Sequence, residues 1–184
     1  MSSYSAFSGA GTDQMNPYDA KDSNLWRKAE YLGRYLFAAD FLKPYRPGIV
    51  ADISCGIGYG SLELGHIAER VIGVDTDHVL IDLATQKCKQ SNIDFIQKNL
   101  DRDDLAPEIV NGSIDAVASF ETLEHILDPD RALSLFSRIL RPGGFLICSV
   151  PNVLFESGDH AGLPRNKSHK QWFNFASLVR MVQR

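Results

Sequence analysis

The segment ETLEH brings two carboxylates and an imidazole close together in the chain. Glu121, Glu124 and His125 stand at positions i, i+3 and i+4, which share one face if the segment is an α-helix. Carboxylate oxygens and an imidazole nitrogen make part of a hard-to-borderline divalent metal site, to which a further histidine would contribute. His160 and His169 lie downstream and can supply it. The segment therefore predicts a candidate metal site.

A glycine-rich loop, ADISCGIGYGS, occupies residues 51–61. Glycines allow positive φ and close approach of a ligand to the backbone. The spacing G-x-G-x-G differs from the dinucleotide fingerprint G-x-G-x-x-G, and no P-loop lysine follows. Asp52, at the expected strand end, would repel a pyrophosphate and attract a cationic amino group. The loop therefore predicts a ligand that carries an amino-acid portion.

Two more polar residues follow expected strands. Asp75 can accept both hydroxyls of a ribose, or it can cap the next helix, although Asp77 is a second candidate for that cap. Asn99 can bond the edge of an adenine, or it can be a simple turn residue. These positions extend the predicted ligand from an amino acid to a nucleoside.

Short apolar segments alternate with amphipathic ones along the chain. Strands are expected at residues 48–54, 70–77, 93–99, 114–120 and 145–152, and helices at 24–42, 61–68, 78–91, 121–140 and 174–184. This alternation predicts an α/β fold, a doubly wound and mostly parallel sheet with helices on both faces. In such sheets ligands bind beyond the carboxyl ends of the strands, where all the residues above are expected.

Composition limits the class of protein. The 184 residues suit one domain, expected at residues 24–184 after a flexible arm at 1–23 that is rich in small and polar residues. A net charge of -4 argues against nucleic acid as a partner, and no apolar run is long enough for a membrane span. Three well-separated cysteines indicate a reducing, cytoplasmic setting.

Five motifs, taken together in this order and spacing, resemble one family: IVADISCGIGYGS, VIGVD, IQKNL, IDAVASFETLEHILDP and LRPGGFLICSVPN. The chain is similar to the class I S-adenosylmethionine-dependent methyltransferases over about residues 30–180. The resemblance implies a Rossmann-like sheet with S-adenosylmethionine across the strand ends. The family sheet usually has seven strands, so its two C-terminal strands are expected to be missing here. The open sheet edge would allow pairing with another chain.

The resemblance also implies roles for individual residues. The residues implied to bind S-adenosylmethionine are Arg34, Asp52, Gly56, Gly58, Asp75, Asn99, Leu100 and Phe120. Arg34 resembles the arginine that holds the methionine carboxylate in ubiquinone-pathway O-methyltransferases, and a guanidinium fork suits that group. Two positions depart from the common pattern, because Ser54 stands where many relatives have glycine and Asn99 where many have aspartate.

For catalysis the resemblance leaves two alternatives open. An E-x-x-E-H segment with a distant histidine binds a divalent metal in ubiquinone-pathway and small-RNA 2′-O-methyltransferases, which implies Glu121, Glu124, His125 and His169 as ligands. In the same groups the distant histidine lies just before a helix, as His169 does. Without a metal, His125 or His169 is expected to act as general base.

The expected activity is methyl transfer to a hydroxyl of a small acceptor. The motifs look most like methyltransferases of surface-polysaccharide or natural-product pathways, so a sugar comes first and a phenol or catechol second. An RNA 2′-hydroxyl, a dinucleotide-dependent oxidoreductase and a non-catalytic S-adenosylmethionine-binding domain are the alternatives. The acceptor would be recognised by residues 153–170 and by the N-terminal arm.

Overall fold

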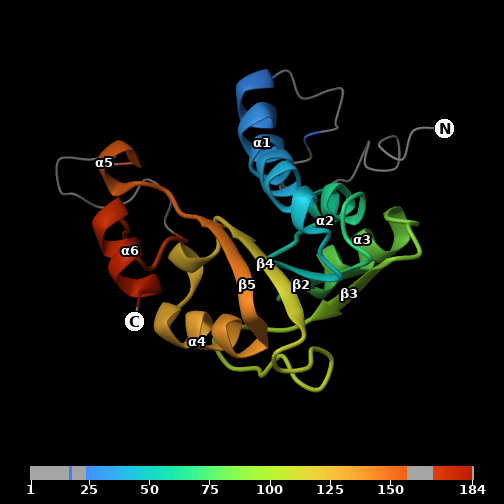
Figure 1. Ribbon diagram of the computed structural model, residues 1–184. Coiled ribbons are helices and arrows are strands. Elements are labelled where there is room, and N and C mark those ends of the chain that lie inside the picture. Colours follow the sequence, from blue (N-terminus) through green and yellow to red (C-terminus); the bar gives the residue numbers. More distant parts are fainter. Residues whose placement is uncertain (1–16, 18–23, 157–167, 184) are drawn as a thin grey trace.

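Five strands form one sheet in which every neighbouring pair is parallel (Figure 1). The computed structural model describes residues 17, 24–156 and 168–183. The strands are β1 (Ile49–Ile53), β2 (Arg70–Asp75), β3 (Ile93–Gln97), β4 (Ile114–Phe120) and β5 (Leu140–Ser149), in the order β3-β2-β1-β4-β5. The order reverses between β1 and β4, which is where doubly wound sheets bind ligands. The predicted fold class is confirmed, and the sheet is entirely parallel within the described residues.

Helices cover both faces of this sheet. Helices α1 (Leu25–Leu42), α2 (Tyr59–Gly65) and α3 (His78–Lys87) pack on one face, and α4 (Pro129–Ile139) and α6 (Phe175–Val182) on the other. Successive strand residues point to opposite faces of the sheet. Val50 therefore packs in the hydrophobic core beneath α1, α2 and α3, whereas Ala51 and Ile53 pack in the core beneath α4 and α6. Both cores need apolar side chains, which is why the strands read as short continuous apolar runs.

Local signals set most helix ends. The side chain of Asn24 accepts a hydrogen bond from the Arg27 amide at the start of α1, and that of Asp77 accepts one from the Val79 amide at the start of α3. The alternative that Asp77 caps α3 is thus confirmed. Pro44 lies in the short 3₁₀ helix η2 (Lys43–Tyr45) that follows α1. Each cap satisfies an amide that the helix itself leaves unpaired.

The predicted helix at residues 121–140 is wrong in its first half. The structure has a 3₁₀ turn, η3 (Leu123–His125), then an extended residue at Ile126, and α4 begins only at Pro129. Proline favours the first helical position, and Asp128 caps it by accepting from the Arg131 amide. Glu121 has a φ of 52°, so it lies outside any helix and does not share a helical face with Glu124 and His125.

Gly60, the third glycine of the loop, lies in the first turn of α2 against the ring of Tyr35. A Cβ at this position would lie 2.0 Å from Cζ of Tyr35. The close contact seats α1 on α2, and the Tyr35 ring also packs edge-on against Phe120 at 4.9 Å. The early third glycine therefore serves helix packing.

Gly60→Ala is expected to destabilise the protein by about 1–3 kcal/mol, because the added methyl group overpacks a closed contact. Gly33→Ala is the matched control, since a Cβ at Gly33 meets nothing within 4 Å. Alanine there is expected to raise stability by about 0.5–1 kcal/mol through its helix propensity. Urea unfolding of both variants measures these changes, and equal effects at the two positions would contradict the packing role of Gly60.

Several expectations fall outside the described residues. The predicted flexible arm at 1–23, apart from Pro17, and His160 lie in these parts of the chain, and the predicted acceptor loop at 153–170 is described only at its two ends. The helix α5 (Val153–Glu156) begins that segment. None of the described helices has the length and apolarity needed to cross a membrane.

Candidate functional site

A pocket of about 530 Å³ opens beyond the carboxyl ends of β1, β2, β3 and β4. Its lining includes many of the residues that the sequence singled out: Arg34, Gly56, Asp75, Asn99, Leu100, Phe120, Glu121 and His125. The other candidates, Asp52, Gly58, Glu124 and His169, are not part of the lining. Residues far apart in the sequence thus converge where the fold predicts a ligand.

The loop after β1 turns through three residues in the left-handed region. Ser54, Gly56 and Gly58 have φ values of 61°, 55° and 84°. Glycine adopts this region freely, whereas a residue with a Cβ incurs an energetic cost there, so Ser54 carries strain at the edge of the pocket. A Cβ on Gly58 would lie 2.8 Å from the Phe95 ring. Gly58 is therefore required for the turn and for packing, while Gly56 faces the pocket.

Asp75 ends β2 with its carboxylate held by two backbone amides. One oxygen accepts from the Gly56 amide at 2.9 Å, and the other accepts from the Asp77 amide at 3.0 Å. Burial raises the pKa of this carboxyl above its usual value, and the two amides oppose that rise. The side chain is thus fixed in place at the pocket, with further acceptor capacity for ligand hydroxyls.

Asn99 and Leu100 line the pocket after β3. The Asn99 side-chain oxygen accepts from the Asp101 amide at 2.9 Å, and the Asn99 amide donates to Asp103 at 2.7 Å. Asn99 therefore shapes a turn, which was the alternative reading of its role, and it does so at the pocket wall. Leu100 is 8% exposed and offers an apolar surface for a flat ring.

Asp52 differs from its expected position beside a ligand. Its carboxylate is fully buried and accepts hydrogen bonds from the Tyr35 hydroxyl at 3.0 Å and the Ser61 hydroxyl at 2.6 Å. Burial raises the pKa of Asp52 to about 6, although these two hydrogen bonds lower it. Tyr35 lines the pocket and Asp52 does not, so Asp52 contributes to the pocket by holding the hydroxyl of a lining residue.

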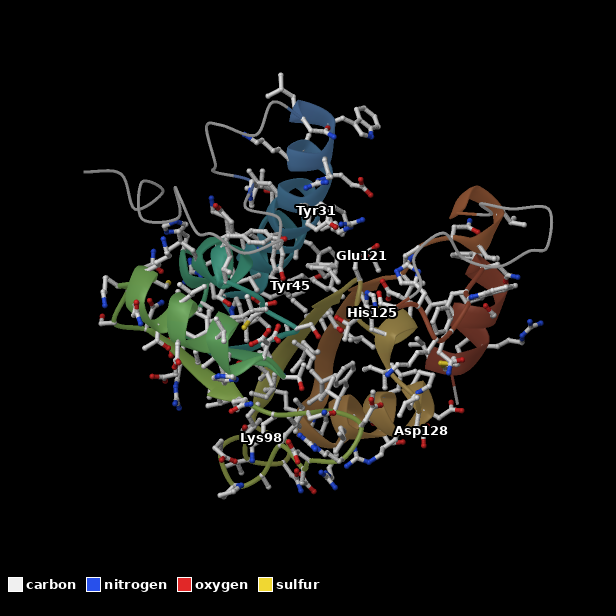
Figure 2. All side chains as sticks on the ribbon, turned by 180° about the vertical axis from the view of Figure 1, so that it is seen from behind. Tyr31, Tyr45, Lys98, Glu121, His125 and Asp128 are labelled. Atoms are coloured by element: carbon white, nitrogen blue, oxygen red, sulfur yellow. The ribbon has the colours of Figure 1, made fainter. Side chains whose placement is uncertain are left out.

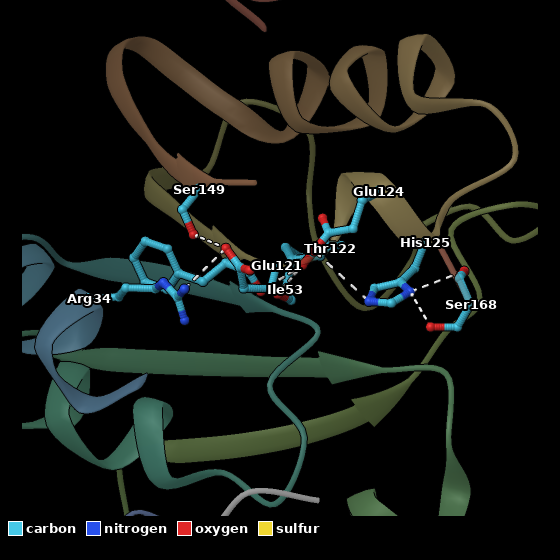
Figure 3. Close-up of polar contacts among 9 residues, drawn as sticks. Arg34, Ile53, Glu121, Thr122, Glu124, His125, Ser149 and Ser168 are labelled. Atoms are coloured by element: carbon cyan, nitrogen blue, oxygen red, sulfur yellow. Dashed lines mark hydrogen bonds and ion pairs between the residues drawn. The ribbon is translucent and has the colours of Figure 1, made fainter. Parts of the chain in front are cut away.

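Glu124, His125 and His169 come together, whereas Glu121 lies elsewhere. One ligand atom from each of the three lies within 4.8 Å of the others, and the two imidazole rings meet edge-to-face with centroids 4.7 Å apart. The backbone amides of Lys170 and Gln171 both donate to the Glu124 carbonyl, which ties His169 to η3. In Figure 3 Glu121 points toward Arg34, away from Glu124 and His125.

The tautomer of His125 follows from its neighbours. Nδ1 lies 3.3 Å from the Ser168 carbonyl oxygen, which can only accept, and 3.2 Å from the Ser168 hydroxyl, which can accept as well as donate, so the tautomer with the proton on Nδ1 suits both contacts (Figure 3). Nε2 then holds a lone pair. Burial lowers the pKa of His125 below its usual value, although the hydrogen bond with the Ser168 carbonyl and the charge of Glu121 oppose this. The lowered pKa favours the neutral form of His125, in which one ring nitrogen can accept a proton at the pocket.

Some lining residues had no signal in the sequence. Tyr31, Tyr35 and Tyr59 line the pocket from α1 and α2, and Lys98 and Lys170 line it near β3 and η3. Aromatic residues at helical spacing are more often part of a core, so spacing alone could not separate these tyrosines from packing residues. Figure 2 shows Tyr31, Glu121 and His125 in the central region of the molecule.

The fold is that of a Rossmann-like α/β protein with a pocket at the carboxyl ends of its strands, and comparison with known proteins defines its family. A family model described as a methyltransferase domain matches residues 51–148. This match includes the glycine loop, Asp75 and ETLEH and covers more than half of the chain. The chain therefore belongs to the class I S-adenosylmethionine-dependent methyltransferases.

Individual relatives agree with this assignment. The chain is 32% identical over 135 residues to a probable S-adenosylmethionine-dependent methyltransferase of Mycolicibacterium smegmatis, covering 73% of this chain and 49% of the relative. It is 30% identical over 109 residues to a ubiquinone biosynthesis O-methyltransferase of Cereibacter sphaeroides, covering 59% of this chain and 43% of the relative. The chain thus spans about half the length of these curated relatives.

Solved structures share the fold. The YcgJ protein of Bacillus has a TM-score of 0.70 at 20% identity, with 82% of this chain and 66% of that chain covered. A putative methyltransferase of Haloferax volcanii, solved with the Trm112 methyltransferase activator, has a TM-score of 0.69 at 21% identity, covering 86% and 70%. At this level of identity the likeness concerns the fold alone.

Proposed function

We propose that this protein transfers the methyl group of S-adenosylmethionine to a hydroxyl group of a small acceptor, first a sugar and second a phenol or catechol. The observation that carries the proposal is the imidazole of His125, which lines the same pocket as Asp75 and Arg34. An O-methyltransferase of ubiquinone biosynthesis among the relatives supports oxygen as the methyl acceptor. The net charge of -4 makes an RNA hydroxyl the less favoured acceptor.

The proposed cofactor contacts follow the order of the strands. Asp75 accepts the ribose hydroxyls, Asn99 and Leu100 flank the adenine, and Phe120 covers the pocket after β4. Gly56 brings the loop backbone close to the amino-acid end, and Gly58 holds the turn that presents it. Arg34 binds the methionine carboxylate, while Asp52 accepts a hydrogen bond from the hydroxyl of Tyr35, which lines the pocket.

Methyl transfer needs a hydroxyl that loses its proton as it attacks. Nε2 of His125 accepts the proton while the acceptor oxygen bonds to the methyl carbon. The carbon–sulfur bond breaks and its electron pair stays on sulfur, which leaves neutral S-adenosylhomocysteine. A histidine unprotonated near neutral pH suits this step.

A divalent cation is the second means of activating the hydroxyl. Glu124, His125 and His169 would hold it, since one oxygen and two nitrogens within 4.8 Å of one another suit a borderline metal. The cation would lower the hydroxyl pKa. Glu121 is less suited to this role than expected, because it lies with Arg34.

The proposal is tested with labelled S-adenosylmethionine and panels of sugars, phenols, catechols and short RNAs. Methyl transfer to sugars or phenols, chemically mapped to oxygen, is expected. Repeating the assay in excess chelator separates the two means of activation, since full activity in chelator leaves a histidine, His125 or His169, as the base. Cofactor binding without transfer to any acceptor would favour a non-catalytic domain instead.

Asp75→Ala is expected to weaken binding of S-adenosylhomocysteine by about 1–3 kcal/mol, through loss of hydrogen bonds to a charged group. Titration calorimetry measures the change. Asp77→Ala is the control, because its side chain caps α3 and is not part of the pocket lining. An affinity that Asp75→Ala leaves unchanged would refute the ribose assignment.

We also propose a reducing, cytoplasmic location. The three cysteines, Cys55, Cys88 and Cys148, are all free thiols, and Cys55 and Cys88 are buried. The described residues thus fit a compartment that keeps thiols reduced. Pairing of the sheet edge with another chain is a further proposal, which size-exclusion chromatography with light scattering tests.

A further inference from the structure

Two side chains of opposite charge face each other at the pocket wall. Arg34 comes from α1 and Glu121 from the turn after β4, and their nearest charged atoms are 3.4 Å apart (Figure 3). Both residues line the pocket, and their side chains are 18% and 25% exposed. The pair is thus accessible to a ligand but largely removed from bulk water. Charge–charge interactions are stronger in such a partly buried site than in bulk water.

The backbone of Glu121 is held in an unusual conformation. Its φ of 52° lies in the left-handed region, where a residue with a Cβ is strained, and its amide donates to the Ser149 carbonyl at 3.0 Å. Strain of this kind persists where the surrounding structure enforces it, and it is frequent at binding sites. The conformation places the Glu121 side chain at the pocket rather than beside Glu124.

The side chain of Glu121 is equally well fixed. The Ser149 hydroxyl donates to its Oε1 at 2.8 Å, and the contact with Arg34 uses the same oxygen. The second oxygen, Oε2, keeps acceptor capacity for a ligand. Arg34 is held in turn by Glu30 at 2.8 Å and by the ring of Tyr31, whose centroid lies 5.3 Å from the guanidinium carbon.

Adjacent positive and negative groups complement a zwitterion. The amino-acid end of S-adenosylmethionine carries a carboxylate and an ammonium on one carbon atom. A guanidinium suits the carboxylate, and a carboxylate oxygen suits the ammonium. Asp52 cannot take the second role directly, because it is fully buried and both its oxygens accept from Tyr35 and Ser61.

We propose that Arg34 and Glu121 form a receptor for this zwitterion, in which Glu121 binds the ammonium group while Arg34 binds the carboxylate. The assignment rests on the proposed function insofar as that places S-adenosylmethionine in this pocket. It gives Glu121 a role in cofactor binding and leaves any metal to Glu124, His125 and His169. It also moves recognition of the amino group from Asp52 to Glu121.

Glu121→Gln tests the proposal, since the amide keeps the shape of the side chain and can still accept from Ser149. Calorimetry with S-adenosylhomocysteine is expected to show affinity weaker by about 10- to 100-fold, as for loss of a charged hydrogen bond. Methylthioadenosine, the same nucleoside without the amino-acid end, is expected to bind the variant within about twofold of the wild-type affinity. An equal loss for both ligands would overturn the proposal.

Glu30→Gln is the matched control, because Glu30 also pairs with Arg34 but does not line the pocket. Glu30→Gln is expected to bind both S-adenosylhomocysteine and methylthioadenosine with affinities within about twofold of the wild-type values. An analogue of S-adenosylhomocysteine without its amino group separates direct from indirect action, and Glu121→Gln is expected to leave its affinity unchanged. A loss for that analogue, or the same loss in Glu30→Gln, would mean that Glu121 acts only through Arg34. These readouts need no acceptor, so a failure to methylate hydroxyls would contradict the proposed function alone.

Discussion

His125→Ala is expected to lower the rate of methyl transfer by about 10²- to 10⁴-fold, the usual contribution of a general base. A proton on Nδ1 suits the contacts of that nitrogen with the Ser168 carbonyl and hydroxyl, and in that tautomer Nε2 is the nitrogen that accepts a proton from the acceptor hydroxyl. Alanine leaves no basic group in its place. Single-turnover kinetics with labelled S-adenosylmethionine measure the chemical step separately from cofactor binding.

The control for this prediction is His78→Ala, which removes an exposed histidine at the start of α3, away from the pocket lining. It is expected to keep full activity. Binding of S-adenosylhomocysteine to His125→Ala is expected to stay near the wild-type value, because the residue acts on the acceptor. Wild-type turnover in His125→Ala would refute both the base and the metal roles of this residue.

Asp52→Asn is expected to make the protein more stable than the wild type above about pH 7, by about 3 kcal/mol. The pKa of Asp52 is about 6 in the folded protein, against a model value of 3.8. When the pKa of a group is higher in the folded than in the unfolded protein, the group stabilises the fold at every pH below its unfolded-state pKa. This stabilisation is lost as the pH rises through the folded-state pKa. The wild type therefore loses this contribution between about pH 4 and pH 7, whereas the neutral amide does not.

The difference between variant and wild type isolates Asp52 from other titrating groups, some of which respond in the opposite direction. Asp104, Glu108 and Asp115 have pKa values below the usual range, so the stability they contribute is lost as pH falls. Asparagine can keep both hydrogen bonds, since the hydroxyls of Tyr35 and Ser61 can each donate or accept. Urea unfolding at a series of pH values measures the difference. If the difference in unfolding free energy between Asp52→Asn and the wild type does not change with pH, ionisation of Asp52 does not destabilise the folded protein.

The strands of the sheet could be predicted from the sequence because both faces of the sheet are buried. Each expected strand is an apolar run between turn residues, and β4 occupies the predicted residues 114–120. The beginning of β5 was less accurate, since the structure already has strand at Leu140. The RPGG segment looks like a turn, but β5 follows β4 through an irregular register there.

The candidate site was less predictable, because two of its features depend on contacts between distant residues. Glu121 was expected on a helix with Glu124, but the amide and hydroxyl contacts with Ser149 hold it in the left-handed region. Asp52 was expected to face the ligand, but Tyr35 and Ser61 take up its carboxylate. Spacing along the chain carries no information about either partner.

Helix α1 packs on α2 through the contact of the Tyr35 ring with Gly60. This contact links the pocket to the dynamics of α1. Tyr31, Arg34 and Tyr35 reach the pocket from α1, whereas Asp75, Asn99 and Glu121 reach it from the sheet. A ligand that contacts both groups can bind fully only while α1 is docked, so its binding energy adds to the free energy needed to open the helix. Hydrogen exchange in α1 therefore becomes a measure of cofactor occupancy, slower in the bound protein and fastest where Tyr35 is displaced.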